Sequence, residues 1–148
     1  MNNHWAIPPA EIERRSFEII DREAPDHNWS PTAWTLIRRL IHTSADFEYS
    51  ASVRIHPEAI SAGINAIRRG RSIITDTHMA KAGISCHRLS SFHNQVFCLI
   101  DQADVVQRAK DLGVTRALAA VDHALEDSSL DVGIWVIGNA PTALFRLL

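Results

Sequence analysis

Three short apolar runs, separated by helical patterns, constrain the fold of this chain more than any other feature. The runs are "RSIIT", "QVFCLI" and "VGIWVI", and polar residues or turn residues follow each of them. Continuously apolar strands are typical of a sheet that is covered on both faces, and their alternation with helices is typical of parallel pairing. We therefore predict an α/β fold with a mainly parallel sheet and helices on both faces, as a single domain over residues 1–148.

Prolines, capping residues and glycines indicate where the helices begin and end. Helices are predicted over residues 8–22, from residue 30 into "HTSAD", over residues 57–70, 78–83, 103–112 and 115–126, and from residue 141 onward. The segment "SASVRIH" has alternating apolar residues and is predicted to form a further short strand. Because ligands of parallel α/β sheets bind beyond the carboxyl ends of the strands, polar residues at those ends are candidate site residues.

The charge of the chain is nearly balanced, with 15 Lys and Arg against 17 Asp and Glu. This balance argues against a nucleic-acid-binding protein, since there is no general basic field to neutralise phosphates. The positive charge is nevertheless grouped into arginine clusters, at residues 14–15, 38–39 and 68–71. Arginine suits bidentate binding of carboxylates or phosphates, although solvated helix faces are the more common explanation for any one pair.

The sequence predicts a cytoplasmic, soluble protein without a metal site or cofactor. Its start lacks the apolar core of a secretory signal, and no apolar run approaches the length that spans a membrane. The two cysteines, Cys86 and Cys98, have no metal-type spacing and are expected to be reduced thiols. The histidines are scattered without paired ligand spacing.

His42 is the candidate proton donor, in the stretch "RRLIHTSADFEY". The neighbouring Arg38 and Arg39 should favour loss of its proton, whereas Asp46 and Glu48 should favour its retention. An anionic ligand that neutralised the two arginines would leave the imidazole free to hold or deliver a proton. The alternative is a structural histidine near a helix end, and the segment alone leaves both open.

Three further residues stand near predicted strand ends or helix starts. Asn139 lies in the Gly-Asn turn of "VIGNAPTAL", whose backbone amides are expected to face an anion. Arg116 lies in the first turn of its helix, where a cation is disfavoured. We therefore expect its charge to be paired, either with an anionic ligand or in an intramolecular salt bridge. Thr77 stands two residues after the strand "SIIT", next to Asp76. The Gly-Asn turn is neither a dinucleotide fingerprint nor a P-loop, so it offers little support for nucleotide binding.

Taken together, five stretches resemble the precorrin-8X methylmutase (precorrin isomerase) family of cobalamin biosynthesis. They are "IPPAEIERRSFEIIDRE", "LIRRLIHTSADFEY", "ITDTHMAKAGI", "GVTRALAA" and "IGNAPTALFRLL". They occur in the family's order along essentially the whole chain. Chains of this family normally continue past the last stretch with a further strand and a glycine-rich segment, so the resemblance implies a C-terminally shortened member.

The resemblance implies an isomerase that moves a methyl group between adjacent ring carbons of a tetrapyrrole-derived macrocycle. The substrate would be precorrin-8X or cobalt-precorrin-8, and the product hydrogenobyrinate or its cobalt counterpart. His42 matches the family's catalytic histidine, while Arg39 and Ser16 match substrate-contacting positions. Thr77, Arg116 and Asn139 would bind further groups of the substrate, whose many carboxylates would explain the arginines. The family also implies a homodimer.

Two alternatives stay open from the sequence. One is a corrinoid-binding or carrier protein without catalytic activity. For Ser16, which lies with Ile12 and Ile19 on a largely apolar helix stripe, the alternative to a substrate contact is a hydrogen bond to the carbonyl four residues earlier.

Overall fold

The computed structural model of the protein describes residues 7–148, and its contacts divide the chain into two compact units. The first unit ends at Ile60, and the second covers Ser61–Leu148. Each unit is described by itself, and the single domain predicted over residues 1–148 stays a prediction. No helix within residues 7–148 combines the length and the apolar character that crossing a membrane requires.

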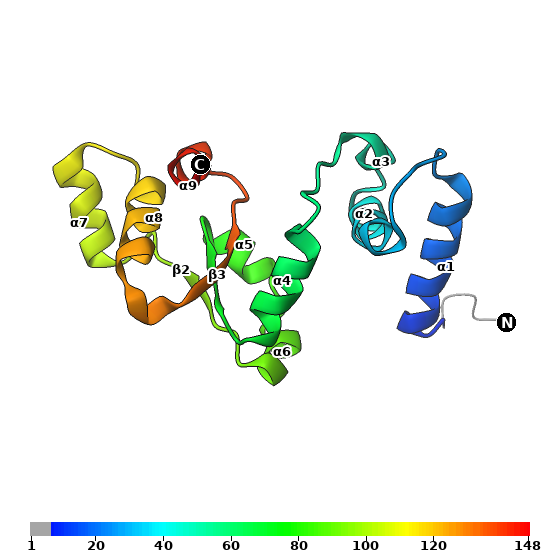
Figure 1. Ribbon diagram of the computed structural model, residues 1–148, viewed down its shortest axis with the longest axis horizontal. Helices are drawn as coiled ribbons and strands as arrows, with labels where there is room; N and C mark the ends of the chain where they lie inside the picture. The colour runs from blue at the N-terminus through cyan, green and yellow to red at the C-terminus, as the bar shows by residue number, and fades with distance from the viewer. Residues whose placement is uncertain (1–6) are drawn as a thin grey trace, which may run out of the picture. The chain divides into compact units, whose positions relative to one another are not determined.

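The first unit consists of α1 (Pro9–Glu23), α2 (Pro31–Ser44) and the short α3 (Tyr49–Ser52) (Figure 1). The start of α2 was predicted from Ser30, whose hydroxyl accepts the backbone N–H of Ala33 at 3.2 Å. At the other end Ala45 adopts a left-handed conformation with φ of 57° and closes the helix within "HTSAD". Both predicted ends of α2 are therefore confirmed.

The core of the first unit differs from the sequence prediction in two respects. Ile20 is buried with Ile37 and Ile41, whereas Ile12 and Ile19 of the predicted apolar stripe are 49% and 43% exposed. The aromatic ring of Phe17 packs on this core and turns the neighbouring face of α1 toward α2.

The second correction concerns "SASVRIH", which was predicted to be a strand. Its first part lies in α3, and residues 53–56 are in neither a helix nor a strand. Val53 and Ile55 still pack on the core, so the alternation of apolar residues was correct. The prediction of a strand was wrong because a strand also needs a hydrogen-bonded neighbour, and this segment has none among the described residues.

The second unit is built on a parallel sheet, which confirms the predicted α/β class. Its strands are β1 (Ser72–Thr75), β2 (Val96–Cys98) and β3 (Val132–Val136), in the order β2-β1-β3. Ile73 pairs with Val96 on one side and with Ile134 on the other. All four residues of β1 are buried, as its central position requires.

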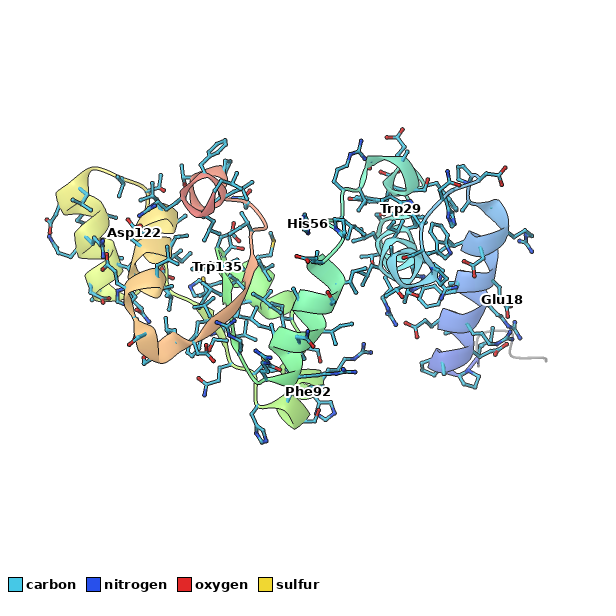
Figure 2. The ribbon with its side chains drawn as sticks, viewed as in Figure 1. Glu18, Trp29, His56, Phe92, Asp122 and Trp135 are labelled. Carbon is cyan, nitrogen blue, oxygen red and sulfur yellow. The ribbon has the colours of Figure 1, made fainter. Side chains whose placement is uncertain are left out.

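The helices and short 3-10 turns that accompany this sheet are α4 (Ala59–Arg68), α5 (His78–Gly83), α6 (Cys86–Leu89), η1 (Ser90–Phe92), α7 (Ala103–Leu112), α8 (Arg116–Glu126), η2 (Ser128–Leu130) and α9 (Pro141–Leu147). Helix α4 precedes the first strand, α9 follows the last one, and the other helices and short 3-10 turns connect the strands (Figure 1). Helices α7 and α8 cover one face, where Ile74, Leu99 and Ala120 belong to one buried cluster and Trp135 packs against it (Figure 2). Ala66 of α4 lies against Gly133 of β3.

Gly70 ends α4 in a conformation that a larger residue could adopt only with strain. Its φ is 70°, and a Cβ at this position would lie 2.8 Å from the carbonyl oxygen of Phe92. We expect Gly70→Ala to lower the free energy of unfolding by about 2 kcal/mol, measured by urea denaturation. Gly63, inside α4, has no atom within 4 Å of the same position. Gly63→Ala should therefore raise stability by about 0.5 kcal/mol, and equal losses in both variants would contradict the prediction.

Candidate functional site

Phe17 is the centre of the candidate site in the first unit. The ring of His42, in the last turn of α2, meets it edge-on at 5.3 Å between centroids and 70° between planes. The guanidinium carbons of Arg38 and Arg39 lie 4.4 Å and 5.4 Å from the same centroid. The cations are thus placed over the negative face of an aromatic ring. Phe17 was missed in the sequence, although it directly follows Ser16 in a matching stretch.

The two arginines differ in how firmly they are held. Arg38 donates to Asp21 at 2.6 Å, and its side chain is only 24% exposed. Arg39 donates to Glu13 at 3.0 Å, in a pair whose side chains are 48% and 44% exposed. Both carboxylates come from α1, so the charges that an anionic ligand was expected to neutralise already have partners within the unit. Exposed ion pairs are weak, so Arg39 is the one that can exchange its partner for a ligand.

The acidic residues after α2 do not reach His42. The Asp46 carboxylate accepts the backbone N–H of Glu48 at 2.9 Å, as at the start of a turn. Neither carboxylate forms an ion pair with the imidazole within the described residues. The expectation that Asp46 and Glu48 hold a proton on His42 is therefore corrected. The exposed imidazole instead faces the ring of Phe17.

Ser16 is half-buried on α1, next to Phe17. Thr35, Thr43 and Ser44 all donate to the carbonyl oxygen four residues earlier, at 3.0, 2.9 and 2.8 Å. The hydroxyl of Ser16 makes no such bond, nor any other hydrogen bond to residues 7–148. Its donor and acceptor capacity is available to a ligand.

In the second unit, Asp76 organises the carboxyl end of the sheet. It follows β1 and is 6% exposed, and its carboxylate accepts the backbone N–H groups of Gly138, Asn139 and Ala140 at 2.9, 2.8 and 2.7 Å. Burial by itself would raise the pKa of the Asp76 carboxyl. The hydrogen bonds that the turn donates to its charged form, together with one from the backbone of Asp76 itself, outweigh burial and bring the pKa below its usual range.

These bonds correct the expectation for the Gly-Asn turn. Its backbone amides do face an anion, but that anion is the buried carboxylate of Asp76 and not a ligand. The side chain of Asn139 is exposed. The substrate contact predicted for this residue would therefore be made by its side-chain carboxamide and not by its backbone. The sequence did contain a signal, since Asp76 is a single acidic residue directly after an apolar strand. It did not show that the backbone of the Gly-Asn turn would bind this carboxylate.

Thr77 and Arg116 both stand at helix starts. The Thr77 hydroxyl caps α5 by accepting the N–H of Ala80 at 3.1 Å, and its own hydrogen has no acceptor among the described residues. Arg116 Nη1 donates to Asp101 Oδ1 at 2.7 Å. The intramolecular salt bridge considered for Arg116 is thus present. Within residues 7–148, no group of three or more His, Cys, Asp or Glu side chains could hold a metal ion.

Comparison with known proteins identifies the family. The sequence pattern of the precorrin-8X methylmutase (CbiC) family matches residues 11–148. The chain belongs to this family. Among curated relatives, the cobalt-precorrin-8 methylmutase of Leptospira interrogans is 40% identical over 92% of this chain, and that of Priestia megaterium is 39% identical over 96%. The chain spans 62% of the length of each of these methylmutases.

The fold of the family is confirmed by a solved structure. The precorrin-8X methylmutase crystal structure from Thermus thermophilus superposes with a TM-score of 0.81 at 43% identity, over 92% of this chain and 66% of that one. The resemblance seen in five stretches of sequence is therefore correct. The roles of Ser16, Arg39, His42, Thr77, Arg116 and Asn139 stay predictions.

Proposed function

We propose that this precorrin-8X methylmutase family member is an isomerase that shifts a methyl group on precorrin-8X or cobalt-precorrin-8, giving hydrogenobyrinate or its cobalt counterpart. The observation that carries the proposal is the family match over residues 11–148. The relatives from Leptospira interrogans and Priestia megaterium are named cobalt-precorrin-8 methylmutases. The proposal includes the cytoplasm as the location and a homodimer as the assembly.

In the proposed mechanism the protein controls one proton while the macrocycle rearranges. A methyl shift of this kind resembles a sigmatropic rearrangement, so it requires neither a nucleophile nor a metal from the protein. An imidazole can donate a proton to the ring and take it back, and it titrates near neutral pH in most settings. His42 suits this role because it is exposed and its ring orientation is restrained by the edge-on contact with Phe17.

The proposed substrate contacts are groups that the structure leaves accessible. Arg39 has an exposed, exchangeable partner, and Asn139 has an exposed carboxamide. The hydroxyl of Ser16 has no hydrogen-bond partner in the part of the chain that the structure describes. Carboxylates of the macrocycle would pair with guanidinium and accept from hydroxyl and amide groups. Thr77 and Arg116 add a hydroxyl hydrogen and further guanidinium N–H groups.

The proposal is tested by mixing the purified protein with precorrin-8X and recording the absorbance of the corrin product. Conversion at a rate proportional to protein concentration would support the isomerase. Tight binding without spectral conversion would favour the non-catalytic corrinoid-binding protein instead. The absence of both binding and conversion would contradict both functions. Light scattering coupled to gel filtration on the same sample gives the mass of the assembly and tests the homodimer.

The two arginines beside Phe17 provide a matched pair of variants. Arg39→Met should weaken hydrogenobyrinate binding about tenfold and change stability by less than about 1 kcal/mol, because it removes an exchangeable guanidinium. Arg38→Met should lower the free energy of unfolding by about 1.5 kcal/mol and leave affinity nearly unchanged, because Arg38 is engaged with Asp21 and Phe17. Calorimetric titration and urea denaturation measure the two quantities. The reverse pattern would rule out the proposed division of roles.

A further inference from the structure

Two aspartates of the second unit follow neighbouring strands, and both accept hydrogen bonds. They differ in burial and in the kind of donor that they bind. Asp76, after β1, is 6% exposed and binds backbone N–H groups that cannot move away without opening the turn. Asp101, beyond β2, has a side chain that is 56% exposed, and its donors among residues 7–148 are all side-chain groups. A carboxylate in the second setting can be replaced by another carboxylate at little cost.

The donors around Asp101 are arranged for the two oxygens of one carboxylate. Arg116 Nη1 donates to Oδ1 at 2.7 Å, and His78 Nε2 lies 2.7 Å from Oδ2. Because a carboxylate only accepts hydrogen bonds, Nε2 of His78 carries the hydrogen. His78 is the first residue of α5 and Arg116 the first residue of α8, so the two donors come from separate helices and converge on one group.

Both donor side chains are accessible to a ligand. The side chains of His78 and Arg116 are 55% and 54% exposed. Neither makes another side-chain hydrogen bond to residues 7–148, so the remaining N–H groups of the guanidinium face solvent. A guanidinium with free N–H groups and an imidazole N–H held beside it form a ready pair for a planar carboxylate.

We propose that His78 and Arg116 together bind one carboxylate of the ligand, and that Asp101 occupies their donors until that carboxylate replaces it. Only the identity of the ligand, a macrocycle with several carboxylates, rests on the proposed function. Exchange of one carboxylate for another keeps the charge at the donors constant and leaves no donor unpaired. Asp101 thus orients the two donors in the free protein and competes with the ligand for them.

The competition predicts opposite effects for substitutions within one small cluster. Asp101→Asn removes the competing charge and should tighten hydrogenobyrinate binding about fivefold. His78→Phe and Arg116→Met remove a donor each and should weaken binding about tenfold. If Asp101 were only a structural support for its neighbours, Asp101→Asn would weaken binding as well. Weaker binding by Asp101→Asn, or unchanged binding by both donor variants, would overturn the proposal.

Asp104→Asn is the matched control, because it makes the same change of charge in the same unit. An Asp104 carboxylate oxygen lies 3.2 Å from Nδ1 of a different histidine, His123, and Asp104 forms no ion pair with an arginine of residues 7–148. This variant should bind hydrogenobyrinate as the unmodified protein does. Melting temperatures close to that of the unmodified protein would show that all four variants are folded, so that their affinities can be compared.

A second measurement separates this proposal from the proposed function. Glutarate, a simple dicarboxylate, should move the imidazole NMR signals of His78, and it should do so at lower concentration in Asp101→Asn. Failure of hydrogenobyrinate to bind, together with these glutarate shifts, would refute the proposed function and support the carboxylate site. Absence of the shifts in both proteins would refute the carboxylate site.

Discussion

His42→Ala should reduce the conversion of precorrin-8X at least about a hundredfold, while hydrogenobyrinate still binds. The reason is that general acid–base catalysis by a positioned side chain typically contributes a factor of about 100 to 10,000, whereas His42 is not one of the proposed carboxylate anchors. The rate of conversion is measured at saturating substrate from the increase in absorbance of the product. Binding of hydrogenobyrinate is then measured by calorimetric titration. Undiminished turnover would end the assignment of His42 as the proton donor.

His56→Ala is a suitable control for this experiment. His56 is an exposed histidine of the same unit (Figure 2), and its Nδ1 accepts the backbone N–H of Glu58 at 3.2 Å. It makes no contact with Phe17 among those described, so its loss should leave turnover unchanged. The edge-on contact of His42 with Phe17 is worth about 1 kcal/mol, so His42→Ala should remain folded. Equal loss of activity in both variants would point to a general effect of removing histidines.

Asp76→Ala should lower the free energy of unfolding by about 3 kcal/mol, a large part of the stability of a domain of this size. The substitution removes the buried carboxylate that accepts the N–H groups of Gly138, Asn139 and Ala140. Asp76→Asn should cost about 2 kcal/mol, because a carboxamide keeps one acceptor oxygen but turns an NH₂ group toward a donor. Urea denaturation followed by tryptophan fluorescence measures both.

Asp111→Ala is the comparison for Asp76. Asp111 is exposed on α7, accepts from Gln107 at 2.8 Å and lies in a helix that tolerates alanine well. Its replacement should stay within about 0.5 kcal/mol of the unmodified protein. A similar loss in both aspartate variants would show that the buried hydrogen bonds of Asp76 are not the cause.

The same carboxylate predicts how stability depends on pH. Burial raises the pKa of Asp76, but its hydrogen bonds to the turn lower it more, so the folded pKa lies below the usual 3.8. Its contribution is therefore present above about pH 4 and is lost as the pH falls through the folded value. Glu11, which accepts from Arg14 and Arg15, has a pKa lowered to about 2 and acts in the same direction. Between pH 4 and pH 2 the unmodified protein should lose stability more steeply than Asp76→Asn.

Several elements could be predicted from the sequence because their causes are local. Ser30 caps α2 through an acceptor that lies three residues from its donor. The strand "SIIT" was recognisable because a central parallel strand is apolar on both faces. The strand predicted in "SASVRIH" failed because pairing depends on a distant segment. The apolar stripe predicted on α1 was wrong because α1 packs through Ile20 and the ring of Phe17, which leaves Ile12 and Ile19 exposed.

By itself the sequence determined the limits of α2, the parallel sheet, the family and the kinds of groups that a site can use. The tertiary structure alone decided which of those groups are already paired. Asn139 donates to a carboxylate 63 residues away, Arg39 to one 26 residues away and Arg116 to one 15 residues away. Caps and periodicity act over one or two turns of chain, whereas an ion pair forms wherever packing brings two charges together. That is why the sequence could name the guanidiniums but not the carboxylates that hold them.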